Sequence, residues 1–111
     1  MIPTEDVLKS LYETVLSRRS QKMEGSYTCY LFAQGIDKIL KKCGEECSEV
    51  IIAAKNGVKK DTVSEICDLL YHLTVLMADE GIRPEDVEEE LERRSKKTGN
   101  LKKFHQVDRN T

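Results

Sequence analysis

Two pairs of acidic residues have the types and spacing to do chemistry, because each pair lies within an otherwise apolar, helix-like stretch. Glu46 and Glu49 are three residues apart, and so are Glu65 and Asp68. Side chains at this spacing share one face of a helix, with Cβ atoms about 5–6 Å apart. If the two helices pack antiparallel across the short connection at 57–61, both pairs can face one point. At a rise of ~1.5 Å per residue, the offset between the pairs lies within side-chain reach.

Four carboxylates gathered in this way repel one another unless a cation neutralises them. Because the stretch supplies oxygen ligands and no dedicated set of histidines or cysteines, it favours Mg²⁺ or Mn²⁺. Such a cluster typically holds phosphates and prepares an attacking water. The alternative is that the acids are solvated helix faces, with Glu65 as the second half of a capping box that begins at Thr62. Spacing alone leaves both interpretations open.

Basic residues surround the first acidic pair on the same expected helix. Three lysines precede it by one to two turns, and a lysine and an asparagine close the helix; these are Lys38, Lys41, Lys42, Lys55 and Asn56. They are either ordinary i, i+4 salt-bridge partners or the cationic half of a polyphosphate site.

Two other titratable features are less suited to chemistry. The acidic run Glu85–Glu89 has no acidic partner on a later helix, and the apolar residues of its helix are only Val87 and Leu91. We interpret it as a solvated helix whose acids suit the positive N-terminal end of the helix dipole. His72, one turn after Asp68, is more typical of a histidine that packs between helices than of a catalytic one.

The residues that must position these groups show helical periodicity throughout the chain. Apolar residues recur at helical spacing, a threonine at position 4 suits an N-cap, and glycines at 57 and 81 suit helix ends. We expect helices over about 4–20, 28 or 30 to 56, 62–80 and 84–95, with a polar loop at 21–27. No strand-like run or internal repeat is found in the sequence. The fold class is therefore all-α, a bundle of four to five helices in one domain over 1–95, followed by a basic, flexible tail over 96–111.

The composition excludes several classes of protein. The chain has 111 residues, of which 39% are hydrophobic and 34% charged, and this fits one small domain of amphipathic helices. No apolar run approaches the ~20 residues of a membrane span, and no signal-peptide stretch is seen, so we expect neither a transmembrane nor a secreted protein. A formal net charge of -2 gives no footprint for nucleic acid. So small a polar chain buries a marginal core alone, and we expect self-association.

The four cysteines are not expected to form disulfides, because nothing in the sequence indicates secretion. Their spacing to the two histidines does not fit a zinc finger either. Reduced cysteine packs as a small hydrophobic residue, so we interpret Cys43, Cys47 and Cys67 as core fillers.

The acidic pattern Glu45-Glu46-x-x-Glu49, followed by Glu65-x-x-Asp68, resembles the metal-binding signature of the MazG-like, all-α nucleotide pyrophosphohydrolases. Its setting is more specific and comprises four segments, at 24–28, 38–46, 53–57 and 68–72. Together they are similar to the phosphoribosyl-ATP pyrophosphatase family of histidine biosynthesis over residues 7 to 94. The three proposed core cysteines stand where that family usually has valine, alanine or another small residue, and the basic tail lies outside the resemblance.

The resemblance implies hydrolysis of phosphoribosyl-ATP to phosphoribosyl-AMP and pyrophosphate by a Mg²⁺-dependent helical homodimer in the cytoplasm. Mg²⁺, or Mn²⁺ in its place, would be held by Glu46, Glu49, Glu65 and Asp68. Glu45 would join Glu46 and Glu49 in catalysis, either as an outer carboxylate that orients water or as an additional metal ligand. A functional link to phosphoribosyl-AMP cyclohydrolase is also implied, with no nucleic acid or membrane as partner.

The resemblance further implies a set of substrate-binding residues, namely Ser26, Tyr27, Thr28, Lys38, Lys41, Lys42, Lys55 and Asn56. The lysines would neutralise the phosphates. The loop at 24–28 leads into a helix N-terminus, which is a natural anion site, and would hold the ribose phosphate.

Two other functions remain open from the sequence. A house-cleaning nucleotide pyrophosphatase of the same superfamily would share the metal cluster, although the 24–28 loop argues against it. A non-catalytic helical dimerisation module would carry the same acids as solvent-facing residues.

Overall fold

The computed structural model describes residues 7–97, which form five helices and no strand. The helices are α1 (Val7–Ser20), α2 (Tyr27–Gln34), α3 (Ile36–Asn56), α4 (Lys59–Glu80) and α5 (Pro84–Ser95). This confirms the expected all-α class. The expected start of the first helix at position 4 and the tail from residue 98 onward lie outside the described residues. No helix in the described range is long and apolar enough to cross a membrane.

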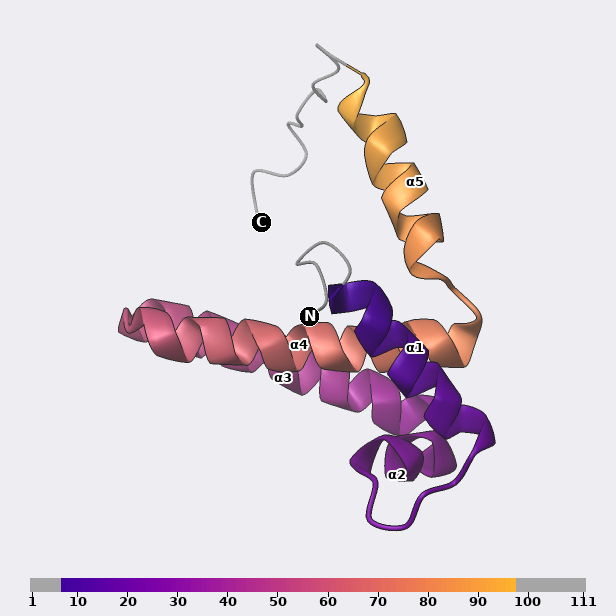
Figure 1. The fold of residues 1–111 in the computed structure, drawn as a ribbon. Coiled ribbons are helices and arrows are strands. Elements are labelled where there is room, and N and C mark those ends of the chain that lie inside the picture. The colour runs from indigo at the N-terminus through magenta and orange to yellow at the C-terminus, as the bar shows by residue number, and fades with distance from the viewer. Residues whose placement is uncertain (1–6, 98–111) are drawn as a thin grey trace.

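An antiparallel pair of long helices, α3 and α4, is the frame of the fold (Figure 1). The chain reverses at Gly57, whose left-handed backbone (φ 81°) lets its N–H reach the carbonyls of Ala53 and Ala54. Glycine adopts this conformation at no steric cost, which is why the helix ends here. The short reversal sets the two helices side by side, and any acid on the facing turns is brought together.

The buried core lies at one end of this helix pair, where α1 and α2 pack against it (Figure 1). Its buried members come from all four helices and are Tyr12, Val15, Leu31, Ile39, Val75 and Ala78. The helix α5 extends away from the pair and contributes no buried residue. Along the rest of their length, α3 and α4 are therefore covered by other helices of this chain on fewer sides.

Two of the expected helix boundaries are wrong. The long second helix is broken at Gly35, where φ is 92° and ψ is -178°, a combination that side chains with a Cβ avoid. The helix α4 begins at Lys59 rather than at Thr62, so Thr62 lies inside it and donates its hydroxyl to the carbonyl of Val58 at 3.4 Å. No capping box forms there, and Glu65 is thus not engaged as a capping residue.

The prediction of three core cysteines is correct only for Cys43, which is buried. Cys47 and Cys67 are exposed in the single chain. They share this exposure with large apolar residues of the same two helices, among them Leu40, Ile51, Ile52, Val63, Ile66 and Leu70. The sequence thus predicts the apolar stripes of α3 and α4, but part of these stripes does not face the core of this chain.

Candidate metal centre

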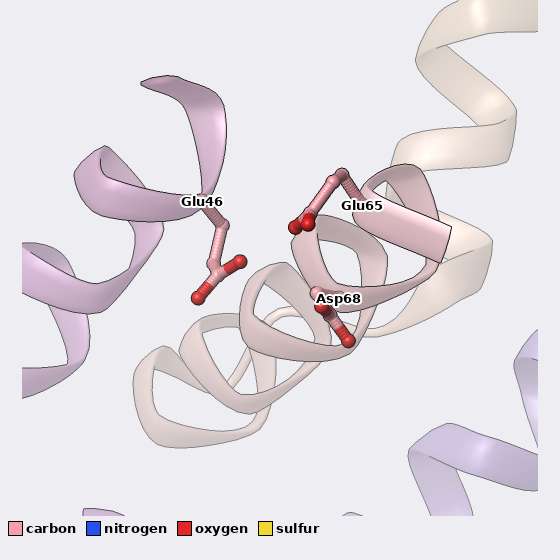
Figure 2. Close-up of side chains that lie close together, drawn as sticks. All are labelled: Glu46, Glu65 and Asp68. Carbon is pink, nitrogen blue, oxygen red and sulfur yellow. The ribbon is translucent and has the colours of Figure 1, made fainter. Parts of the chain in front are cut away.

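Three carboxylates from two helices converge halfway along the α3–α4 pair (Figure 2). Glu46 comes from α3, whereas Glu65 and Asp68 come from successive turns of α4. Each offers a carboxylate oxygen, and the three oxygens lie within 4.8 Å of one another. Glu46 and Glu65 are half-buried, and Asp68 is exposed, so the cluster is open to solvent on one side.

The cluster is electrostatically unfavourable without a counter-ion. Burial raises the pKa of Glu65, and the negative charges of Glu49, Asp68 and Glu46 raise it further. A cation at the centre of the cluster would remove this repulsion. Three hard oxygen donors with an open side suit Mg²⁺, which keeps several water ligands when protein carboxylates bind it. The residues present therefore fit a divalent metal.

Lys42 lies close to Glu46 of the cluster and also to Glu45, the preceding residue on α3. Its Nζ lies 3.1 Å from Glu45 Oε1 and 3.7 Å from Glu46 Oε2. The hydrogen bond to Glu45 raises the pKa of Lys42 and lowers the pKa of Glu45. Glu45 is thus paired with a lysine and lies outside the group of three. Lys42 is the only cation within 4 Å of a cluster carboxylate in the described part of the chain.

Glu49 and Asn56 lie on the next turns of α3 and line a neighbouring hollow of about 250 Å³. Its wall on α4 includes Glu65, so Glu49 faces the cluster from one side although it is not one of the three convergent acids. Asp61 and Ser64 line the same hollow and were not singled out by the sequence pattern. Both lie in the first turns of α4, which begins at Lys59, before the start that the sequence pattern predicts.

A chain of hydrogen bonds connects α2 to the cluster. Tyr27 Oη lies 3.1 Å from His72 Nε2, and His72 Nδ1 lies 2.9 Å from the carbonyl oxygen of Asp68. Because a carbonyl only accepts, Nδ1 carries a proton and donates to Asp68, and in that tautomer Nε2 accepts from the Tyr27 hydroxyl. His72 is buried, in agreement with its interpretation as a packing residue. Beside it, the hydroxyls of Thr28 and Tyr71 are hydrogen-bonded.

The other predicted substrate-binding residues are scattered around α2 and α3. Ser26 caps α2 by accepting the N–H of Cys29 at 3.1 Å. Lys38 Nζ lies 5.8 Å from the centroid of the Tyr30 ring. Lys41 and Lys55 are exposed on α3 and form no ion pair within residues 7–97. The structure therefore brings only Lys42 and Asn56 of this set against the acidic residues.

A larger hollow, of about 700 Å³, lies between the end of α1, the loop at 21–26 and α2. Its wall includes Ser26 together with residues that sequence reasoning missed, chiefly Arg18, Arg19, Lys22 and Tyr30. In the sequence, the feature that could have indicated this hollow is the pair of arginines in the last turn of the first helix. Cations there are so common as partners of the helix dipole that they indicated no site.

Comparison with known proteins places the chain in a defined family. Residues 8–95 match the family described as phosphoribosyl-ATP pyrophosphohydrolase. The phosphoribosyl-ATP pyrophosphatase of Clostridium novyi (strain NT) is 53% identical over 97 residues, which cover 87% of this chain and 88% of that protein. Its counterpart from Pelotomaculum thermopropionicum is 56% identical over 93 residues, covering 84% and 95%. The histidine biosynthesis bifunctional protein HisIE of Caldanaerobacter subterraneus subsp. tengcongensis is 54% identical over 97 residues, covering 85% of this chain and 47% of that longer protein.

Proposed function

The chain belongs to the phosphoribosyl-ATP pyrophosphohydrolase family, and on this premise we propose that it hydrolyses phosphoribosyl-ATP to phosphoribosyl-AMP and pyrophosphate. It is thus a hydrolase that acts on an acid anhydride, in histidine biosynthesis. We further propose that the reaction depends on Mg²⁺ held by the acidic residues of α3 and α4. The observation that carries this part is the convergence of Glu46, Glu65 and Asp68 within 4.8 Å.

The proposed ligands are these three carboxylates and, as a fourth, Glu49. Glu49 is included because its negative charge raises the pKa of Glu65 across the helix pair, and because the two side chains line one hollow. When bound, Mg²⁺ would neutralise phosphate oxygens and lower the pKa of a coordinated water. The packing of α3 against α4 would keep these ligands close to one another.

The residues around the proposed ligands would bind the phosphates of the substrate and act on the attacking water. Lys42, beside Glu46, is placed to contact phosphate oxygens of the bound nucleotide, with Lys38 and Lys41 on the preceding turns of α3 adding positive charge. Glu45 accepts a hydrogen bond from Lys42, which lowers its pKa and keeps it ionised, so it would act as an outer carboxylate that orients the attacking water. Lys55 and Asn56 would contact substrate from the far end of α3.

We also propose that the protein acts as a homodimer, with a second copy covering the exposed apolar residues of α3 and α4. Ile51 is 68% exposed and Ile52 56% exposed in the single chain. Exposing several large apolar side chains side by side to water is unfavourable, and such patches mark interaction surfaces. The bifunctional relative, about twice as long as the matched segment, supports a functional link to the cyclohydrolase that acts on phosphoribosyl-AMP. The cytoplasmic location implied by the resemblance remains a prediction.

The Mg²⁺ site is tested by Glu46→Gln, which keeps the size of the side chain and removes one ligand charge. A bound metal contributes several kcal/mol to transition-state stabilisation, so pyrophosphate release should fall by about 10²-fold or more. Glu89→Gln, which alters an exposed acid on α5, is the matched control and should keep full activity. Near-normal turnover in Glu46→Gln, with folding verified by circular dichroism, would contradict the ligand assignment.

A further inference from the structure

Two hydrogen bonds between side chains join the first turn of α2 to α4, and the function proposed above gives their partners on α4 no task. Thr28 is hydrogen-bonded to the hydroxyl of Tyr71. The preceding residue, Tyr27, has its Oη 3.1 Å from His72 Nε2. The bonded residues are consecutive in both helices. Two neighbouring bonds fix the rotation of α2 about its own axis as well as its distance from α4.

Tyr71 holds its end of this attachment from a packed position. Its ring stacks on that of Tyr27 with centroids 6.1 Å apart and meets the His72 ring edge to face at 4.9 Å. It also packs against the buried core. Burial raises the pKa of its hydroxyl, although the hydrogen bond with Thr28 acts in the opposite direction. Tyr71 therefore remains a neutral phenol when it binds the Thr28 hydroxyl.

The helix α2 depends on its neighbours for its position. It has eight residues, of which only Leu31 is buried. An isolated helix of this length is marginal in water, so most of its stability must come from packing and from contacts with other helices. The two hydrogen bonds to α4 lie at its first turn, whereas Leu31 lies one turn further along. They therefore determine where that first turn lies.

The aromatic residues of α2 act in turn on two lysines of α3. Lys38 Nζ lies 5.8 Å from the centroid of the Tyr30 ring, which stacks on that of Tyr27 with centroids 6.0 Å apart. The pKa of Lys42 is raised mainly by its hydrogen bond with Glu45, and Tyr27 raises it further. Tyr27 is therefore within electrostatic reach of Lys42. Both lysines are among those that the proposed function assigns to the phosphates.

From these contacts we propose that Tyr71 is a positioning residue for the hydrolysis: through Thr28 it fixes the first turn of α2, and that turn keeps the phosphate-binding lysines of α3 in place. The proposal rests on the function proposed above. It also changes the role of Thr28, which the family resemblance places among the substrate-binding residues. The hydroxyl of Thr28 is engaged by Tyr71, and it acts through α2 rather than on the substrate.

A double-mutant cycle separates these two roles of Thr28. Tyr71→Phe and Thr28→Val each remove one side of the same hydrogen bond with little change in side-chain shape. Because a displaced α2 misplaces the groups that hold the phosphates, each variant should lower kcat/KM for phosphoribosyl-ATP by roughly 10-fold or more. The double variant should lose no more than either single variant, since the two residues act as a unit. Losses that multiply, or a full kcat/KM in Tyr71→Phe, would overturn the proposal.

Two further variants separate positioning from general destabilisation. Thr28→Ser retains the hydroxyl and should restore most of the activity that Thr28→Val loses. Tyr12→Phe removes a phenol hydroxyl from the buried core and should keep the kcat/KM of the wild type. All variants are compared at a temperature at which circular dichroism shows them folded. A Thr28→Ser variant as impaired as Thr28→Val, or an equal loss in Tyr12→Phe, would leave Tyr71 with a structural role alone.

Amide hydrogen exchange tests the attachment of α2 without any need for activity. In Tyr71→Phe, exchange should accelerate in peptides from the first turn of α2 and stay unchanged in peptides from α5. If the wild type releases no pyrophosphate from phosphoribosyl-ATP, the proposed function fails, and exchange still decides whether Tyr71 holds α2. If the wild type is active, unchanged exchange in α2 of Tyr71→Phe overturns the positioning role although the function stands.

Discussion

Tyr27 and His72 are joined by a hydrogen bond of 3.1 Å between the phenol and Nε2, across a separation of 45 residues in the chain. The other nitrogen of His72 donates to the carbonyl of Asp68, so the histidine is fixed at both ends. The two rings also meet edge to face, with centroids 5.7 Å apart. The first turn of α2 is thereby tied to the turn of α4 that carries a cluster carboxylate.

We predict that Tyr27→Phe destabilises the protein. It removes the donor and leaves a buried ring nitrogen of His72 without a partner, which costs about 1–3 kcal/mol. In a domain of this size, each kcal/mol lowers the melting temperature by roughly 4–8 °C. Tyr12→Phe is the control, because its hydroxyl has no hydrogen-bond partner in residues 7–97. Equal melting temperatures for the two variants, measured by circular dichroism, would show that the hydrogen bond contributes nothing.

Glu65→Gln should have opposite effects on stability and on metal binding. Folding raises the pKa of Glu65, so the ionised carboxylate opposes folding once the pH rises above the pKa of the unfolded chain. At neutral pH without metal, the variant should therefore melt at a higher temperature than the wild type. Its melting temperature should respond less to millimolar Mg²⁺, because a ligand that binds the folded state stabilises it. An unchanged response to Mg²⁺ would remove Glu65 from the site.

The alkylation of Cys29 should depend on pH in a manner that distinguishes it from the other cysteines. Since the folded protein lowers the pKa of its thiol, the midpoint of alkylation rate against pH should lie below that of the urea-denatured chain. The thiolate then favours the folded state above the unfolded pKa, and this contribution is lost as the pH falls through the folded pKa. Cys43 is the internal comparison, because burial raises the pKa of its thiol. A midpoint for Cys29 at or above the denatured value would contradict a thiol pKa lowered by hydrogen bonds from Ser26 and Met23 and by the charges of Arg18 and Lys22.

Ile51→Glu should convert the proposed dimer to a monomer. Ile51 is 68% exposed in the single chain, so the change should not disturb the fold of a monomer. In a symmetric dimer the residue occurs twice, and losing the burial of about 1.5–3 kcal/mol per side chain weakens association by roughly 10²-fold or more. Light scattering at several concentrations provides the measurement, with Gln21→Glu as a control of equal charge change. A wild type that is monomeric at all concentrations would contradict the dimer.

The sequence was sufficient to predict the helices wherever one residue decides the boundary. Gly57 and Gly81 end α3 and α4 as expected, in left-handed conformations, and Pro84 begins α5. Gly35 was not recognised as a break, because the apolar periodicity continues through it and a glycine inside a helix is tolerated at modest cost. Only the observed backbone angles separate α2 from α3.

The candidate site was predictable to the level of the two acidic pairs, but not to the level of which acids meet. Spacing places Glu46 and Glu49 on one face of a helix, and it is the packing register of α3 on α4 that brings Glu46 to Glu65 and Asp68. The exposure of Cys47 could not be foreseen either. A helical pattern identifies an apolar stripe without showing whether this chain or another covers it.

The most direct test of the account is pyrophosphate release in the presence of Mg²⁺ from phosphoribosyl-ATP, measured beside ATP, dUTP and dCTP. We predict rapid release from phosphoribosyl-ATP, little from the three plain nucleotides, and loss of activity when the metal is chelated. Comparable turnover of the plain nucleotides would retain the metal chemistry but contradict the substrate and indicate a house-cleaning pyrophosphatase. Folded protein that releases no pyrophosphate from any of the four would contradict the enzymatic function and favour a helical dimerisation module.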